Sequence, residues 1–328
     1  MLTTRFTELV GCSVPIQQAG MGSHAKPRMA AAVANAGGLG MVSVYGDYGG
    51  PPENVAKMLD NTREQTSGVF GANFIMKGVE PELAHETVRA AAEHAKVVEF
   101  FYTDPDPALI EIVHSKGALA CWQVGSREEA VAAVDAGCDF VVAQGIEAGG
   151  HVRGTFGLLA LLDQVLRAVD VPVVAAGGIG SGRAMAAVLA AGADGVRVGT
   201  RFLAVEEAEA HPDYVKALIA AEAQDTVYTD AFSVGWPNAP HRVLRSSLEA
   251  VQAFQGEFVG TNADSWDGQS YQLPRFSCHA VHKSATGHIE AMSQWAGEGV
   301  GSLKKVQTAA EIVHELTSEA EMLLRRWS

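Results

Sequence analysis

The sequence predicts a (β/α)8 TIM barrel with an inserted or appended cap region and a C-terminal helix. Eight short apolar runs alternate with amphipathic stretches over the first two-thirds of the chain, which predicts parallel strands joined by right-handed helical crossovers. Many glycines lie at the ends of these runs, as tight strand-to-helix loops require. The length of 328 residues is within the range of roughly 200 to over 400 residues for such barrels. An open doubly wound sheet is the alternative, because periodicity alone does not show closure.

Each predicted strand is a short apolar run. The eight strands are residues 15–19, 39–43, 69–74, 97–102, 118–123, 140–144, 173–176 and 195–198. Among the helices between them are residues 27–36, 81–94, 126–136 and 182–191. Pro27 suits the first turn of a helix, and Ser126 with Glu129 forms a capping-box pattern at the start of another.

The pattern changes after the eighth strand. Residues 206–302 have weak periodicity and several turn signals around Trp236 and Trp295, which predicts a cap or substrate region. The chain then ends in a helix, where Thr308 and Glu311 form a second capping box. One face of this helix is apolar, at Ile312, Leu316, Ala320 and Leu323. We therefore expect a barrel domain of residues 1–205 plus 303–328.

The composition excludes several classes of partner. The 24 Lys and Arg against 38 Asp and Glu give a net charge of −14 without a basic run, so we expect no nucleic-acid or membrane partner. The N-terminus lacks a signal-peptide pattern and no apolar stretch reaches the ~18 residues of a spanning helix, so we expect a soluble cytoplasmic protein. A homodimer is a possible assembly. The cysteines lack CxxC spacing and read as reduced, buried residues; Cys278, His279, His282 and His288 give only a weak hint of metal ligands, and no metal site is expected.

The loops after the strands carry the candidate site, because a barrel of this class has its active site at the carboxyl ends of its strands. The first loop begins with Gly20, Met21 and Gly22, and the sixth contains Gly149, Gly150 and His151 within QGIEAGGHVRG. After the seventh and eighth strands come Gly177 and Gly178, and then Gly199 and Thr200.

The seventh and eighth loops predict a phosphate site. A phosphate needs several converging backbone N–H donors, and glycines leave that backbone uncovered. The helix that starts near Gly182 is expected to direct its positive end at the same place, and Thr200 adds a hydroxyl donor. Tight turns alone are the alternative for these glycines. A Rossmann site is disfavoured, because GGIGSG lacks the GxGxxG spacing.

Three side-chain amides lie at strand ends beside these loops, on Asn73, Gln123 and Gln144. An amide both donates and accepts hydrogen bonds, which suits the alternating edge of a flavin ring. Each amide alone is equally compatible with a structural role. Together with a phosphate site they favour flavin mononucleotide (FMN) as cofactor.

Several segments in order resemble the nitronate monooxygenase family, formerly called 2-nitropropane dioxygenase. They are PIQQAGMGSHAKPRMAAAVANAGGLGMVS at 15–43, GANF at 71–74, QGIEAGGHVRG at 144–154 and PVVAAGGIGSGRAMAAVLAAGADGVRVGTRF at 172–202, with AGEGVG at 296–301. The resemblance spans about residues 5–205 and is poor over about 205–295.

The resemblance implies a barrel that holds FMN noncovalently. Gly20, Met21 and Gly22 would lie along the ring, and Gln123 and Gln144 would reach ring or ribityl groups. The phosphate would lie against Gly177, Gly178, Gly199 and Thr200. The activity implied is oxidation of an alkyl nitronate, or of a nitroalkane, by oxygen to a carbonyl compound and nitrite.

His151 matches the active-site histidine of that family. Gly149 and Gly150 are expected to let the loop pass close to the flavin and present this side chain to the substrate. A histidine can hold the oxygens of a nitronate or remove a proton from a nitroalkane; ordering the turn is the structural alternative. Arg153 is expected to offset the acidic net charge at the mouth, and His24 and His241 are weaker candidates for the pocket.

Two other functions compete. One is an FMN-dependent NAD(P)H:quinone or enoyl-thioester reductase on the same barrel, and the other is a flavin-free lyase, isomerase or binding protein. No second nucleotide motif is visible, which favours the monooxygenase over the reductase.

Overall fold

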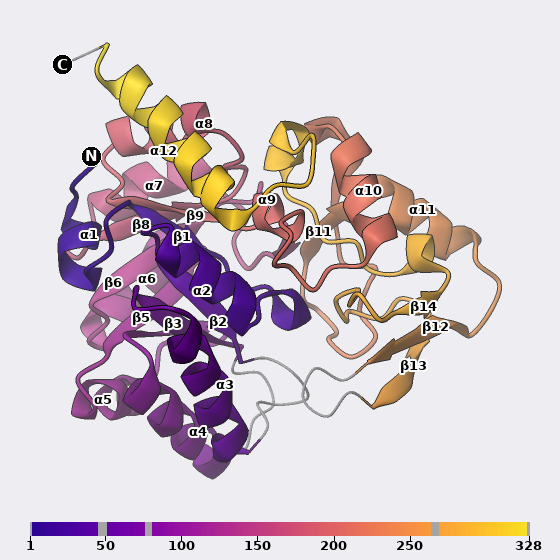
Figure 1. Cartoon of the computed structure of the whole chain (residues 1–328), viewed down its shortest axis with the longest axis horizontal. Helices are drawn as coiled ribbons and strands as arrows, with labels where there is room; N and C mark the ends of the chain where they lie inside the picture. Colours follow the sequence, from indigo (N-terminus) through magenta and orange to yellow (C-terminus); the bar gives the residue numbers. More distant parts are fainter. Residues whose placement is uncertain (1, 45–50, 76–80, 264–268, 327–328) are drawn as a thin grey trace.

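The computed structural model describes residues 2–44, 51–75, 81–263 and 269–326 and contains a barrel of eight parallel strands (Figure 1). The strands are β1 Ile16–Gln18, β2 Gly40–Ser43, β3 Phe70–Ile75, β4 Val97–Phe101, β5 Leu119–Val124, β6 Phe140–Gln144, β8 Val173–Ala176 and β9 Gly195–Val198. Their bounds agree with the predicted strands to within one residue at every end, since each strand is a buried run with at most one half-buried residue at its end.

The sheet closes on itself. Its strand order is β1-β9-β8-β6-β5-β4-β3-β2, and the ring is completed where Leu39, just before β2, bridges to Gln17 of β1. Leu39 N donates to Ile16 O at 2.8 Å, and Gln18 N donates to Leu39 O at 3.0 Å. These bonds confirm the barrel and exclude the open sheet.

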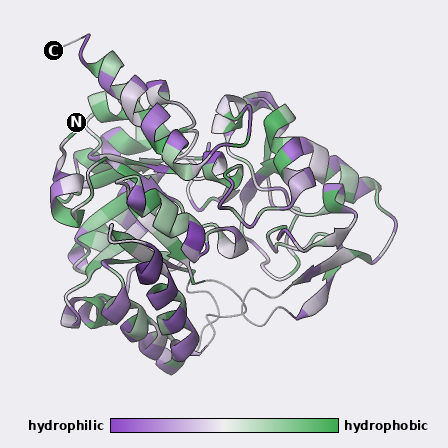
Figure 2. Cartoon of the chain, in the orientation of Figure 1, coloured by the Kyte–Doolittle hydropathy of each residue, from purple (hydrophilic) through white to green (hydrophobic). Residues whose placement is uncertain are grey.

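Helices surround the barrel in the order the sequence predicts. They are α2 Pro27–Asn35, α3 Pro52–Gln65, α4 Pro81–His94, α5 Pro107–Ser115, α6 Arg127–Asp135, α7 Leu158–Leu166, α8 Gly182–Ala190 and α12 Ala309–Leu324. Their outward faces are polar, most clearly on α3 and α4 (Figure 2). Thr308 and Glu311 form the predicted capping box of α12. Ser126 caps α6, but the Glu129 side chain bonds Gly125 N instead, so that capping box is only half formed.

A short N-terminal helix that the sequence analysis missed, α1 (Arg5–Val10), covers one end of the barrel. Phe6 is fully buried and meets Phe140 of β6 edge-on, with ring centroids 5.4 Å apart. Phe6 and Val10 join the interior side chains of the strands in one apolar cluster. The opposite end of the barrel is where the carboxyl ends of the strands lie.

A second group of elements follows β9 and lies beside the barrel (Figure 1). Its elements are α9 Thr200–Leu203, α10 Pro212–Ala220, β10 Thr226–Thr229, β11 His241–Leu244, α11 Arg245–Ala253, β12 Phe258–Ala263, β13 Ser270–Pro274 and β14 Thr286–Gly287, with the short 3-10 helices η3 Ala223–Asp225, η4 Ile289–Ala291 and η5 Glu298–Ser302. They pack around an apolar cluster of their own that includes Tyr214, Phe232 and Leu273. The sequence predicted a cap here but not its helices and two small sheets. The division into domains at residues 205 and 303 stays a prediction.

One cap sheet is joined to a barrel loop. Its strand order is β10-β11-β7, and β7 is Gly150–His151, from the loop after β6. His151 is paired with His241 and Gly150 with Arg242 in antiparallel register. The loop expected to carry His151 is therefore fixed by a strand from the cap.

The cysteines agree with the sequence analysis, since Cys12, Cys121, Cys138 and Cys278 are all buried and none of them is in a disulfide. Burial raises the pKa of the thiols of Cys12 and Cys138 to about 12. No helix in the described part of the chain is long and apolar enough to cross a membrane.

Candidate active site

A cavity of about 210 Å³ lies between the carboxyl ends of the barrel strands and the cap. All the site residues singled out from the sequence line it: Gly20, Met21, Gly22, Asn73, Gln123, Gln144, Gly149, Gly150, His151, Gly177, Gly178, Gly199 and Thr200. They come from six loops or strand ends that are distant in sequence. Their place in the lining of one cavity is established, and their roles in binding stay predictions.

Gly149 and Gly150, which precede His151, are needed as glycines for different structural reasons. Gly150 has a φ of +74°, a conformation that favours glycine. A Cβ on Gly149 would lie 2.4 Å from the backbone nitrogen of Gly297, so this glycine allows the C-terminal AGEGVG segment to pack against the loop. The close approach expected toward a cofactor is, at Gly149, an approach to the protein's own backbone.

The His151 ring is half-buried among aromatic side chains of the cap. Its centroid lies 4.0 Å from that of Trp236 and 5.3 Å from that of Trp295. Its Nδ1 lies 3.2 Å from Ala239 O. Because a carbonyl oxygen only accepts, this bond requires the proton on Nδ1, so a neutral His151 carries its lone pair on Nε2.

The predicted amides are held by neighbours that define which atom each presents. Gln144 Nε2 donates to His151 O at 3.1 Å, and its Oε1 is buried without a hydrogen-bond partner among the described residues. Asn73 Nδ2 donates to Glu99 Oε1 at 2.6 Å. The side-chain amide nitrogens of Asn73 and Gln144 are therefore engaged within the protein. Their carbonyl oxygens remain as acceptors for a ligand.

A buried ion pair lies inside the barrel at the floor of the cavity. Glu99 is fully buried, and Arg197, which lines the cavity, donates to Glu99 Oε1 at 2.5 Å. Gln17 Nε2 donates to the other carboxylate oxygen at 2.6 Å. Each charge has the partners that a buried charge needs. The sequence signal was a single charge within the apolar runs VVEFF and GVRVG, and the sequence analysis overlooked it.

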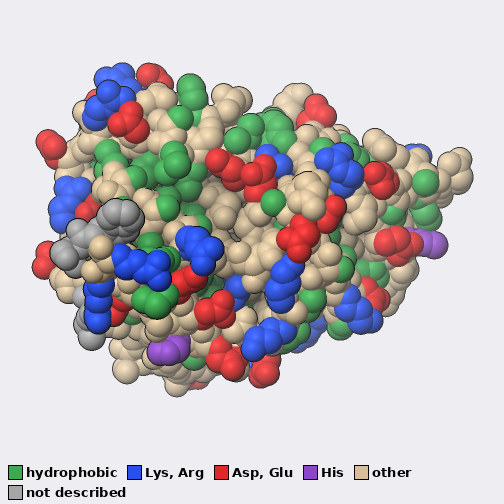
Figure 3. Space-filling view, turned by 90° about the horizontal axis from the view of Figure 1, so that it is seen from above, with side chains coloured by type: hydrophobic (Ala, Val, Ile, Leu, Met, Phe, Trp, Pro, Cys, Tyr) green, Lys and Arg blue, Asp and Glu red, His purple; other side chains and the backbone are tan. Residues whose placement is uncertain are grey.

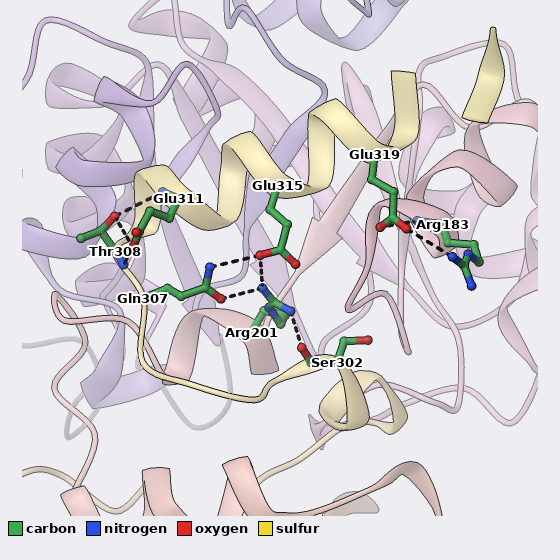
Figure 4. A network of polar contacts seen from close by, with 8 residues as sticks. All are labelled: Arg183, Arg201, Ser302, Gln307, Thr308, Glu311, Glu315 and Glu319. Atoms are coloured by element: carbon green, nitrogen blue, oxygen red, sulfur yellow. Dashed lines mark hydrogen bonds and ion pairs between the residues drawn. The ribbon is translucent and has the colours of Figure 1, made fainter. Parts of the chain in front are cut away.

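The predicted phosphate loops lie at the cavity. Gly177 and Gly178 have φ of +116° and +66°, and Thr200 Oγ1 accepts from Gly297 N at 3.0 Å. Two amides at the start of α8 are engaged within the protein, because Ser181 Oγ accepts from Ala184 N and Glu319 accepts from Arg183 N. The role expected for this helix at the phosphate stays a prediction. Glu319 of α12 covers the positive end of α8 near Arg183 (Figure 4).

Arg153 is not the mouth cation that the sequence suggested. It is not among the residues that line the cavity, and it pairs with Glu129 at 2.6 Å and with Asp104 at 2.5 Å. Acidic and basic side chains are interspersed on the face shown in Figure 3. The net charge of −14 is therefore not gathered into a single acidic patch on that face.

The cap supplies a wall that the sequence analysis did not identify. It contains Trp236, Asn262, Tyr271, Cys278, His279 and Trp295. The tryptophans in a turn-rich segment were the only signal, and their distance in sequence from the barrel loops hid their place. Cys278 and His279 do not form a metal site with His282 and His288, since the described residues contain no group of three or more potential ligands.

His24 and His241, the two weaker candidates for the pocket, differ in their position relative to the cavity. His24 lines the cavity and is almost fully buried; its Nδ1 lies 3.3 Å from Glu209 O, and burial lowers its pKa to about 4. His241 does not line the cavity but lies behind His151, with ring centroids 5.6 Å apart.

Known proteins are similar to this chain over most of its length. The family model described as nitronate monooxygenase matches residues 3–319. A probable nitronate monooxygenase of Staphylococcus aureus is 31% identical over 339 residues, covering 90% of this chain and 91% of that protein. The (3aS,4S,5R,7aS)-5-hydroxy-7a-methyl-1-oxo-octahydro-1H-indene-4-carboxyl-CoA dehydrogenase of Rhodococcus jostii is 38% identical over 273 residues, covering 83% of this chain and 74% of that protein.

Solved structures are similar over the full chain. FabK from Thermotoga maritima has a TM-score of 0.81 at 29% identity, covering 100% of this chain and 99% of that one. Nitroalkane oxidase from Streptomyces ansochromogenes has a TM-score of 0.79 at 29% identity, covering 99% of this chain and 100% of that one. The chain therefore belongs to the nitronate monooxygenase family of flavin-dependent oxidoreductases.

Proposed function

We propose that the protein oxidises alkyl nitronates, and nitroalkanes after deprotonation, with FMN and oxygen, yielding a carbonyl compound and nitrite. The observation that carries this proposal is the position of His151. Its ring lies on the cavity wall at the carboxyl ends of the strands, with Nδ1 on Ala239 O and the indole of Trp236 against its face.

The cavity fits FMN on the chemistry of its donors and acceptors. The buried, unpartnered Oε1 of Gln144 would accept a hydrogen bond from the ring or the ribityl chain. The loops at Gly177–Gly178 and Gly199–Thr200 would hold the phosphate through backbone N–H groups. At Gly199 an added Cβ would meet no protein atom closer than 3.5 Å, so there is room for a ligand beside that loop. Bound FMN would supply the redox chemistry between the organic substrate and oxygen.

The protein's own part in the reaction is proton handling and substrate placement. A neutral His151 would take the proton from the carbon next to a nitro group at Nε2, since Nδ1 is engaged with Ala239 O. A protonated His151 would hold the oxygens of a preformed nitronate. Trp236 and Trp295 would exclude water from the ring and the reacting carbon.

A second candidate is an oxidoreductase of coenzyme A thioesters. The 38% identical relative named as a carboxyl-CoA dehydrogenase favours it. The chemistry is related, because a thioester, like a nitro group, acidifies the neighbouring carbon and His151 would serve as the base there too. The two candidate functions would differ only in the substrate group, nitro or thioester, that His151 and the cap bind.

The test is an assay of nitrite release. Purified, flavin-loaded protein is mixed aerobically with an alkyl nitronate and, separately, with the parent nitroalkane, while parallel reactions contain NADH or NADPH with a quinone and with an enoyl-CoA thioester. We expect nitrite from nitronate without pyridine nucleotide. Rapid nucleotide oxidation with negligible nitrite would overturn the proposal and favour the reductase.

A further inference from the structure

His241 lies directly behind His151 in the sheet that joins the cap to the barrel. It begins β11, is fully buried, and is paired with His151 across the β7–β11 ladder. The two rings are nearly perpendicular, at 85°. Because β7 has only two residues, His241 is one of the two residues of β11 that hold it in register.

The hydrogen bonds of His241 define a single neutral form of its ring. Phe232 N donates to Nε2 at 3.2 Å, and an N–H group cannot accept, so Nε2 carries no proton. The proton is therefore on Nδ1, which donates to Ala239 O at 2.9 Å. Burial lowers the pKa of His241, in agreement with a neutral ring.

The same carbonyl oxygen is the acceptor for His151. Ala239 O lies 2.9 Å from His241 Nδ1 and 3.2 Å from His151 Nδ1, and its two lone pairs allow it to accept both protons. The next residue is held as well, since Pro240 O accepts from Val152 N at 2.9 Å. The two imidazole rings therefore share Ala239 O as acceptor, in a segment that is paired with the chain just after His151.

We propose that His241 is a positioning residue for His151: by holding Ala239 O, it keeps the proton of His151 on Nδ1 and leaves Nε2 as the nitrogen that takes the substrate proton. This inference rests on the proposed function, in which His151 is the base. A histidine in the wrong tautomer loses that role even when its ring stays in place. His241 itself touches neither the cavity nor the substrate.

Two substitutions separate positioning from simple core packing. His241→Asn places an amide near the position of Nδ1 and can still donate to Ala239 O, whereas His241→Gln places it near Nε2, where it can accept from Phe232 N but no longer reaches Ala239 O. Both remove the ring and are of similar polarity. His288→Gln, at an exposed histidine of the cap, is the matched control.

The primary measurement is the NMR shifts of the two ring nitrogens of His151 in flavin-bound protein labelled at its histidine nitrogens. The signals are assigned with His151→Asn and recorded at about pH 9, where an imidazole is neutral. We expect the Nδ1-protonated tautomer in the wild type, in His241→Asn and in the control, and a mixture of tautomers in His241→Gln. An unchanged His151 tautomer in folded His241→Gln would overturn the inference.

Turnover gives the second readout. We expect His241→Gln to lower kcat with a neutral nitroalkane about tenfold while the KM and kcat for preformed nitronate change little, and His241→Asn to restore most of the loss. Equal losses with both substrates, or no rescue by Asn, would show a merely structural role. If the wild type releases no nitrite from either substrate, the proposed function fails, and the tautomer measurement still decides whether His241 positions His151.

Discussion

At the scale of single residues, the site depends on contacts between side chains that are distant in sequence. His151 was predicted from the loop in which it lies, but its partner Ala239 O is 88 residues further along and belongs to the cap. Glu99 and Arg197 were missed because a charge inside an apolar strand has no recognisable motif. Sequence patterns identified which residues end strands, and only the folded chain shows what each one touches.

Replacing His151 tests the base directly. His151→Asn should retain bound flavin and lose roughly 10²–10⁴-fold of its turnover with a neutral nitroalkane, because no group remains to take the proton. The loss should be smaller with preformed nitronate, which needs no deprotonation. Steady-state nitrite release with both substrates measures this difference. Near-wild-type rates with both would show that His151 only orders its loop.

At the scale of elements, the eight strands lie where the sequence predicted, and the glycines singled out in the loops after them line the cavity. The β7 strand could not be predicted, because two residues contain no periodicity and their partner β11 is remote. The contact of α12 with the start of α8 was not predicted for a similar reason, since Glu319 lies 136 residues beyond Arg183.

The loop after β9 offers a clean test of the phosphate site. At Gly199 the φ is −112°, which suits any residue, and an added Cβ would make only ordinary contacts, 3.5 Å from Ala19 and 3.8 Å from Met21. Gly199→Ala should therefore fold normally and bind FMN at least tenfold more weakly, because the methyl group enters space assigned to the phosphate. Fluorescence titration of the flavin-free protein measures the affinity. Gly178→Val is less informative, since its φ of +66° makes any substitution strained.

Unchanged FMN affinity in folded Gly199→Ala would show that the phosphate lies elsewhere. Gly117→Ala is the control for backbone strain of the kind expected in Gly178→Val, because Gly117 has a φ of +76° and no atom within 4 Å of an added Cβ. It should lower stability without changing flavin affinity.

The helix α12 is tied to the loop after β9 by Arg201, which is buried (Figure 4). Its guanidinium bonds Ser302 O, Gln307 Oε1 at 3.0 Å and Glu315 Oε2 at 3.2 Å. Arg201→Met should lower the free energy of unfolding by about 2 kcal/mol, because buried acceptors lose their donor. Urea denaturation measures the change. Arg183→Met on the same face should change it by less than about 0.5 kcal/mol, since the Arg183–Glu319 contact is exposed; equal effects would contradict this account.

At the scale of the whole molecule, composition and periodicity were sufficient for the barrel, because each strand and helix buries one regular face. The cap was predicted only as a region, since its strands are short and its core forms from segments spread between Leu203 and Leu303. Barrel and cap meet at the cavity, where buried histidines from both lie close to ionisable neighbours. The lowered pKa values of these histidines make the free energy of unfolding depend on pH.

Acid should destabilise the protein through His24. Its pKa is about 4 in the folded state against 6.5 for the free side chain, so the unfolded chain binds the extra proton between these values. The stability that a neutral His24 contributes is present above pH 6.5 and is lost as the pH falls toward 4, by about 3 kcal/mol at most. The free energy of unfolding, measured with denaturant at several pH values in this range, should change less with pH for His24→Gln than for the wild type. An identical dependence on pH in the two proteins would contradict the assignment.

The central claim, a flavin at this site that takes electrons from a nitronate, is tested most directly by mixing the purified protein with single reductants in the absence of oxygen. The account predicts a yellow protein that releases FMN on denaturation, and whose flavin absorbance is bleached by an alkyl nitronate but not by NADH or NADPH. Bleaching by a pyridine nucleotide and not by nitronate, or a colourless protein that takes up no FMN, would contradict it.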